Sequence, residues 1–328
     1  MKAWNGLRKG LSHFELYEVV GIVVSILAMT VFFAYGDAVD QKQGVEGWHW
    51  YPVQWIWDIY RDFIPKAFLI ALAVLLFVGW WKYRDLRWGV KKTLTIARVA
   101  LPFCVLLIIY RALNFYIPLF APVDRDQWLL DVDQWLFGTH PSLWMEPMIR
   151  PWLTDWMSFV YMAWFPMIFI TLLLMFLHAR QTVAAYVTSA LFSFYIGYFC
   201  YTLVPATGPL YTLADSYTVS LTGGAISDLR QGVVSPNDLA VPRDVFPSLH
   251  TAISCVMFYY IAKYRPRWLW LYVPMVVSIL ISTVYLRYHY VIDVFAGVAL
   301  AAFTCYAGER WSVWWRVRMG RQEERDSA

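Results

Sequence analysis

The chain has 328 residues, of which 60% are apolar and only 15% are charged, and its mean hydropathy is positive. Soluble domains carry about 25% charged residues, so this composition excludes an ordinary soluble domain and indicates a protein of the lipid bilayer. The net charge of +4 is mild and does not indicate a nucleic-acid partner.

Apolar runs predict about eight membrane-spanning helices, because a helix crosses the bilayer with about 20 residues. In chain order the runs cover residues 19–36, 64–82, 99–119, 156–177, 183–204, 248–263, 268–286 and 289–308. No small-residue cleavage motif follows the first run, which is interpreted as a retained helix and not as a signal peptide. The predicted fold class is therefore an all-α, polytopic membrane helix bundle.

Basic residues are concentrated on one set of connections. The segments 1–18, 82–98, 178–182, 263–267 and 309–328 hold 18 of the 27 Lys and Arg residues. Short cytoplasmic loops carry such an excess, so we expect both termini in the cytoplasm.

Three long connections then fall on the extracytoplasmic side: 37–63, 120–155 and 205–247. In the middle one, Trp128 and Trp135 alternate with acidic residues, a pattern that suits an amphipathic segment in the headgroup layer. A folded external loop is the alternative. The third connection is rich in Pro and Gly and is interpreted as an ordered loop or lid.

Two motifs, 245–250 and 287–293, each lie where a late apolar run begins. In the second, His289 and Asp293 are four residues apart and share one helix face. The first contributes His250, also at a helix start. Under the predicted topology both motifs lie at the extracytoplasmic surface, so these three side chains are expected to gather there as a phosphoryl-transfer site.

The His289–Asp293 pair could be structural, but ionisable groups inside a membrane cost about 3 kcal/mol and usually have a function. A carboxylate bonded to one imidazole nitrogen fixes the tautomer and leaves the other nitrogen as a nucleophile. His250 follows Pro247 and Ser248 at a helix start, and its expected role is the general acid that protonates the leaving oxygen.

Three arginines are candidates for binding phosphate. Arg287 is two residues from His289, and its guanidinium can hold two phosphate oxygens at once, although basic residues also anchor helix ends to headgroups. Arg243 precedes the first motif and could close over the substrate. Arg111 lies within a predicted span, where it needs an anion or a polar cavity.

Two other classes of function use the same residues. His250, His289 and Asp293 could form a two-histidine, one-carboxylate metal site in a hydrolase, although no HExxH motif is present. Alternatively, Arg111 and the His–Asp pair could line the pathway of a transporter for a polar or anionic solute. The chain shows no internal symmetry of the kind that many transporters have.

The two motifs resemble those of the phosphatidic-acid-phosphatase type 2 (PAP2) superfamily of membrane phosphatases and phosphotransferases. The resemblance is carried by Phe246–His250 (FPSLH) and His289–Asp293 (HYVID), with Pro205–Tyr211 as a third, weaker element. Within the superfamily, the chain is similar to the inositolphosphotransferase branch related to inositol phosphorylceramide synthase. The resemblance covers roughly residues 100–308.

This resemblance implies a six-helix catalytic core built from the last six predicted spans. It also implies metal-independent attack by His289 to form a phosphohistidine, with Asp293 orienting it and His250 protonating the departing group. Ser248 and its neighbouring amides would cradle the phosphate.

From the third element, Gly208 and Tyr211 are candidate residues of the substrate loop. The chain also departs from the family pattern. A Lys-x₆-Arg-Pro element is missing before residue 205, Thr283 stands where the family has Arg, and Leu249 replaces the usual Gly. These departures modestly favour a transferase over a plain lipid phosphatase.

The sequence therefore predicts an N-terminal part (1–98), a PAP2-like catalytic membrane core (99–308) and a charged cytoplasmic tail (309–328). We expect it to cleave or transfer a phosphoryl or phospho-headgroup at the extracytoplasmic face. A lipid phosphate or phospholipid would be the donor, and an alcohol or lipid a possible acceptor. No cofactor or resident metal is expected.

Overall fold

The computed structural model describes residues 10–43, 50, 53, 57, 86–233 and 243–320. The predicted span 64–82 lies outside these residues. The longer helices are α2 (Leu16–Gln43), α5 (Leu86–Phe120), α8 (Pro151–His178), α9 (Val183–Leu203), α12 (Leu249–Tyr264), α13 (Leu269–Tyr285) and α14 (Val291–Met319). The shorter ones are α6 (Asp126–Phe137), α7 (Pro141–Trp144), α10 (Pro209–Thr212) and α11 (Ala225–Val233), with 3₁₀ turns at Glu146–Met148, Arg180–Thr182, Ala214–Ser216 and Pro266–Trp268.

The described ranges contain no strand, and one isolated bridge pairs Ala206 with Asp244. Five described helices are long and apolar enough to cross a membrane: Leu16–Asp37, Pro151–His178, Val183–Leu203, Pro266–Tyr285 and Val291–Met319. The predicted span 248–263 corresponds to α12, which has 16 residues, and 99–119 lies within α5, whose apolar part is Leu101–Leu113. The predicted all-α membrane helix bundle is therefore confirmed.

The chain forms two compact units, one of Met1–Tyr17 with Ile117–Ala328 and the other of Glu18–Tyr116. In the second unit, the Tyr116 hydroxyl of α5 donates a hydrogen bond of 2.6 Å to the Ala28 carbonyl of α2. The first unit contains both histidine motifs and α6 to α14, so the candidate site can be described within it.

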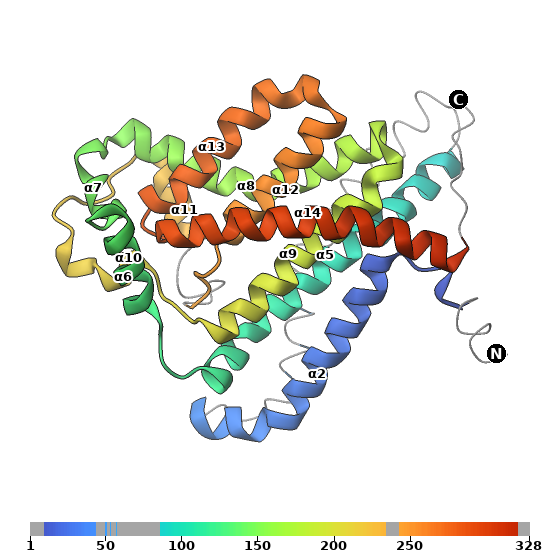
Figure 1. Cartoon of the computed structure of the whole chain (residues 1–328), viewed down its shortest axis with the longest axis horizontal. Coiled ribbons are helices and arrows are strands. Elements are labelled where there is room, and N and C mark those ends of the chain that lie inside the picture. The colour runs from blue at the N-terminus through green and yellow to red at the C-terminus, as the bar shows by residue number, and fades with distance from the viewer. Residues whose placement is uncertain are drawn as a thin grey trace. The chain divides into compact units, whose positions relative to one another are not determined.

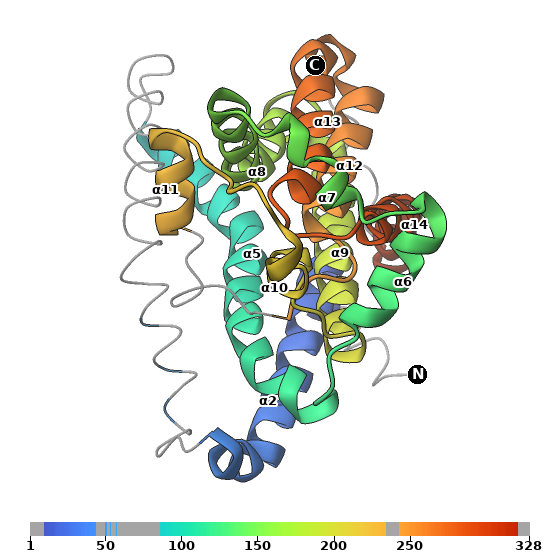
Figure 2. The same ribbon diagram turned by 90° about the vertical axis from the view of Figure 1, so that its left-hand side faces the viewer.

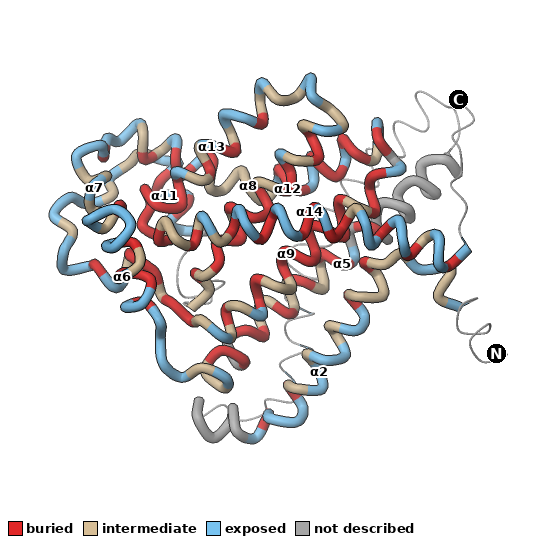
Figure 3. The backbone as a smooth tube through the Cα atoms, in the orientation of Figure 1, coloured by how far each residue is buried: buried red, intermediate tan, exposed pale blue. Residues whose placement is uncertain are grey.

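In the first unit, α9 is more buried than the other helices long enough to cross a membrane. In its most apolar stretch 78% of the residues are buried, against 33–39% for α8, α13 and α14. Helix α14 packs along α9 and α12, while α12 also packs on α8 and α13 (Figure 1). One face of α14 is buried along most of its length and the other is exposed (Figure 3). This is the pattern expected of helices whose outer faces contact lipid.

Buried hydroxyls join the helices of this bundle in pairs. Ser193 on α9 lies 2.7 Å from Thr304 on α14, and Thr154 on α8 lies 3.0 Å from the hydroxyl of Tyr285 on α13. Each interhelical bond of this kind contributes about 0.6 kcal/mol in a membrane, and the small side chains also allow the backbones to approach closely.

Helix α14 approaches α9 closely at Gly308. A Cβ atom at this position would be 2.1 Å from the Oγ of Ser189 and 2.9 Å from its backbone nitrogen. We therefore expect Gly308→Ala to destabilise the protein by about 1–3 kcal/mol, because the two helices must move apart. Thermal unfolding in detergent measures the effect.

Gly232→Ala is the control, since Gly232 of α11 (Ala225–Val233) is exposed and nothing lies within 4 Å of a Cβ added there. It should unfold at or slightly above the wild-type temperature, because Ala favours helix. Equal unfolding temperatures for the two variants would contradict this account of the α9–α14 contact.

Candidate active site

The two histidines of the sequence motifs lie side by side in the structure. His250 is in the first turn of α12, whose N-cap Ser248 accepts a hydrogen bond from the Thr251 amide. His289 lies in the connection between α13 and α14, and it is only 5% exposed. Their ring centroids are 6.1 Å apart with the planes tilted by 59°. One small group placed between them could contact both rings.

Asp293, in the first turn of α14, contacts one histidine of this pair. Its Oδ2 lies 3.4 Å from His289 Nδ1 and accepts the Tyr290 amide at 2.8 Å. The contact with His289 is close enough for an ion pair but is not aligned as a hydrogen bond, as is common for catalytic contacts without a substrate. The Asp293 carbonyl also accepts the Ser248 amide at 3.1 Å, which ties α14 to the start of α12.

Burial lowers the pKa of His289 to about 4, although the charge of Asp244 and the backbone of Val245 act in the opposite direction. His289 precedes α14 and so lies in the connection between the spans Pro266–Tyr285 and Val291–Met319. Its imidazole is therefore neutral at physiological pH, which is the form that can act as a nucleophile.

Aromatic rings hold His250 on two sides. The Tyr161 ring stacks on it with centroids 4.2 Å apart, and the Trp164 ring lies at 4.3 Å, both from α8. Tyr288, the neighbour of His289, packs on Tyr161 at 4.9 Å. The rings of Tyr161 and Trp164 thus restrict the rotation of His250.

The predicted substrate loop also reaches this site. The amide of Leu210 donates to the Arg287 carbonyl at 2.7 Å, and Gly208 has a positive φ of 89°. A Cβ at Gly208 would be 2.6 Å from the Tyr288 carbonyl oxygen, so only glycine permits this contact. The Tyr211 side chain is 49% exposed. Gly208 therefore packs on the backbone beside His289, whereas Tyr211 lies at the surface.

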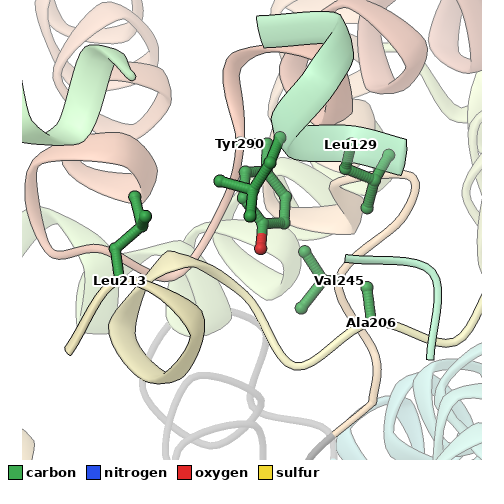
Figure 4. Packing of buried hydrophobic residues seen from close by; sticks show 6 residues of the cluster. Leu129, Ala206, Leu213, Val245 and Tyr290 are labelled. Atoms are coloured by element: carbon green, nitrogen blue, oxygen red, sulfur yellow. The ribbon is translucent and has the colours of Figure 1, made fainter. Parts of the chain in front are cut away.

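Two buried carboxylates of α6 fasten these segments together. Asp126 accepts the amides of Thr207 and Gly208 at 2.8–3.0 Å and the Tyr290 hydroxyl at 2.8 Å. Around it, an apolar cluster joins α6, the 205–213 segment, Val245 and Tyr290 (Figure 4). The short helices α6, α7 and α10 lie near one another, on the left of the view in Figure 1, which is the side that faces the viewer in Figure 2.

Asp133 is the second of these carboxylates, and it caps α14. Its two oxygens accept the amides of Val291 and Ile292 at 2.8 and 2.9 Å. Burial raises the pKa of Asp133, whereas both amides and His140 act to lower it. The first turn of α14 is thus bonded both to Asp133 of another helix, α6, and to its own residue Asp293. These bonds fix the backbone beside His289.

Two further carboxylates hold the 217–233 segment. Glu146 accepts the amides of Thr218 and Val219, and these amides are a main cause of its lowered pKa. Asp155 accepts the amides of Gly224 and Ser227 at 2.9 Å, which docks α11 on α8. Sequence analysis did not identify these roles, because the partner amides are about 70 residues away.

The three predicted arginines have other contacts. Arg287 has a positive φ of 67°, pairs with Glu146 at 3.1 Å and lies over the Tyr217 ring at 3.5 Å. Arg243 pairs with Asp124 at 2.9 Å. Arg111 is in α5, within the other compact unit. Arg287 and Arg243 are therefore neutralised by carboxylates in the structure.

A fourth arginine, which sequence analysis missed, is buried next to the site. Arg230 on α11 is 5% exposed, and its Nε donates to Ser158 at 3.0 Å while Nη1 donates to the Tyr288 hydroxyl. The sequence offers one weak signal: Arg230 follows Ser227 by three residues and so shares its helix face, which is buried, whereas Leu229 is exposed.

Over the described part of the chain, no group of three His, Cys, Asp or Glu side chains is arranged to hold a metal ion.

A family model described as the PAP2 superfamily matches residues 127–307, more than half of the chain. The match contains all of α6 but its first residue, the 205–211 turn and both histidine motifs. The chain therefore belongs to the PAP2 superfamily, which implies a membrane-bound, phosphatase-type enzyme. Neither the curated proteins nor the solved structures contain a match.

Removal of the cap on α14 should displace His289. Asp133→Ala leaves the amides of Val291 and Ile292 without their acceptor, and we expect a loss of about 0.5–2 kcal/mol in stability. Enzymatic turnover should fall about 10–100-fold, because small displacements of reacting groups are costly. Turnover and thermal unfolding measure the two effects.

Asp131→Ala is the control on the same helix. Its side chain is exposed and accepts only a local hydrogen bond from Gln127. This variant should retain activity and stability. An Asp133→Ala variant as active as Asp131→Ala would show that the cap does not position His289.

Proposed function

We propose that the protein is a lipid phosphatase or phosphotransferase that acts through a phosphohistidine at His289. The observation that supports this most directly is the geometry of the site. Two buried histidines lie with ring centroids 6.1 Å apart, and a carboxylate at i+4 contacts one of them. Superfamily membership supports the reaction class independently.

In the proposed first step, the imidazole nitrogen of His289 that does not face Asp293 attacks phosphorus and forms an N–P bond. The bond from phosphorus to the departing oxygen breaks, and His250 donates a proton to that oxygen. Asp293 stabilises the positive charge that develops on His289. In the second step, water or an alcohol attacks phosphorus, His250 accepts its proton, and the N–P bond breaks to restore both histidines.

We assign the site to the extracytoplasmic face. The histidines lie at the starts of α12 and α14, where α13 ends. The opposite ends of these helices carry the basic residues, namely Lys263, Arg265, Arg267, Arg310, Arg316 and Arg318. The positive-inside rule assigns such an end to the cytoplasm, which supports the expected location of the site and of both termini.

The substrate we propose is a lipid phosphate or phospholipid that enters from the bilayer. Exposed aromatic residues surround the site end of the first unit, including Trp128, Trp135, Trp144 and Trp152. Trp is enriched at membrane interfaces, so this end lies at the depth of lipid headgroups. The motif departures favour an inositol phosphorylceramide synthase-like transferase, in which a lipid alcohol replaces water as the acceptor.

His289→Ala should abolish turnover of lipid phosphates by purified protein, because no other group forms the N–P bond. His250→Ala should reduce turnover by about 10²–10⁴-fold and slow phosphoenzyme formation, because the leaving oxygen is not protonated. Rapid quenching with a ³²P-labelled lipid phosphate, followed by alkaline gel separation, measures acid-labile label on the protein. Retained turnover in His289→Ala would exclude this mechanism.

The fate of the label distinguishes the two activities. With a donor labelled at phosphorus and a mixture of sphingolipid and glycerolipid alcohols, a transferase moves the label to a new lipid. A hydrolase instead releases the label into water, as inorganic phosphate from a lipid phosphate or as the phosphorylated headgroup from a phospholipid. We expect transfer to dominate, and activity should persist with a strong chelator and fall with vanadate. Complete loss of activity on chelation would instead support a metal-dependent hydrolase.

A further inference from the structure

An open groove of about 440 Å³ lies within the first unit, where α13 ends and α14 begins. Helix α7 packs on α13 and α6 packs on α14 at this place. Of the residues that line the groove, only Thr139 carries a hydroxyl, and none is charged. A volume of this size is typical of sites that bind a small ligand. The walls are formed mainly by Phe137, Trp144, Leu280, Val284, Val291 and Val294.

The groove continues into the outer surface of two membrane spans. On α13, Val277 is exposed one turn before the groove residue Ile281, and on α14, Val298 is exposed one turn after Val294. At the edge of the groove, the ring of Phe137 lies 6.4 Å from the exposed ring of Phe295. Because the outer faces of membrane spans contact hydrocarbon, the groove opens onto the apolar part of the bilayer.

The opposite end of the groove lies at the depth of the lipid headgroups. Trp144 of α7 forms part of its wall and is 65% exposed. Trp135 of the neighbouring α6 is also exposed, and Trp side chains are enriched at the membrane interface. A lipid whose chain occupies the groove would therefore have its headgroup beside α7.

The groove is on the outer side of α14, away from the contact between Asp293 and His289. Asp293 is fully buried, whereas the groove residues Val291 and Val294 are half-buried. At 3.6 residues per turn, these two valines lie about 160° and about 100° around the helix from Asp293. An occupant of the groove is consequently separated from the histidines by the first turn of α14, which distinguishes it from the proposed substrate.

The groove nevertheless borders the connection that carries His289. Its residues Val284 and Val291 flank this connection on the two sides. The Thr283 carbonyl, next to Val284, accepts the amides of Tyr288 and His289 at 3.0 Å each. An empty groove leaves its lining without van der Waals partners, so a chain packed against both valines would stabilise both ends of the connection.

We propose that the groove binds one hydrocarbon chain of a bilayer phospholipid that is not the substrate, and that this chain braces the connection carrying His289. Close packing supplies the affinity, because the chain moves from one apolar medium to another and gains little from the hydrophobic effect. The groove and the membrane fold support this inference, which goes beyond the proposed function and does not depend on the reaction.

The test uses purified full-length protein in phosphatidylcholine vesicles that contain a phosphatidylcholine with a photoreactive diazirine in its acyl chain. Mass spectrometry should find the label concentrated on the peptides that line the groove. Leu280→Trp should reduce this labelling about tenfold or more, because the indole fills the space that the chain needs.

Val273→Trp is the matched control. Val273 is exposed on the same face of α13, two turns before Leu280, and does not line the groove. This variant adds the same bulk to the lipid-facing surface and should leave the groove labelling at the wild-type level.

Thermal unfolding of the wild type gives a second measurement that needs no variant. A ligand that binds the folded state raises the unfolding temperature. In delipidated protein, long-chain phosphatidylcholine should therefore raise this temperature more than a short-chain phosphatidylcholine at the same concentration. Equal shifts with the two lipids would contradict a chain-binding groove.

Two labelling results would also overturn the inference. Label spread evenly over all lipid-facing helices, or unchanged in Leu280→Trp, would indicate surrounding bilayer lipid only. Displacement of the groove label by excess lipid phosphate, but not by excess phosphatidylcholine, would show that the groove holds the substrate. Labelling and unfolding are measured without turnover, so a wild type that labels as expected but has no phosphoryl turnover would overturn the proposed function alone.

Discussion

The site depends on one recurring interaction, in which a carboxylate of residues 126–155 accepts backbone amides from a distant segment. Asp126 holds the 207–208 turn, Asp133 holds the start of α14, and Glu146 and Asp155 hold the segment that leads into α11. Amides at a helix start or in a tight turn have no partner within their own segment, so a charged acceptor both satisfies them and determines where the segment lies. The position of His289 is therefore set largely by residues about 160 positions earlier in the chain.

These contacts also affect where phosphate can bind. Helix starts are common anion sites, but the first amides of α14 are already bonded to Asp133 and its N-cap amide to Asp293. In the proposed mechanism, a phosphoryl group beside His289 therefore obtains its stabilising charge from side chains or from the start of α12.

Most of the fold was predictable from the sequence, because apolar length and i, i+4 spacing are local properties. They located each described long helix and brought His250, His289 and Asp293 to one end of the bundle. The partners of the arginines were not predictable. Arg287 lies beside His289 in the chain, yet its charge is neutralised by Glu146, 141 residues away. The residues of α6 were likewise predictable only in part. The exposed Trp135 fits the expected interfacial helix, but the burial of Asp133 depends on its distant partners in α14.

The contact between α12 and α14 explains how the two histidines stay together at the junction of separate helices. The Ser248 amide donates to the Asp293 carbonyl, so the residue that starts α12 is bonded to the residue that orients His289. A displacement of either helix start would stretch this bond and change the distance between the rings. In the proposed mechanism, the general acid and the nucleophile contact the same phosphoryl group and must be held within a few tenths of an ångström. A direct backbone link between their helices meets that requirement better than contacts through flexible side chains.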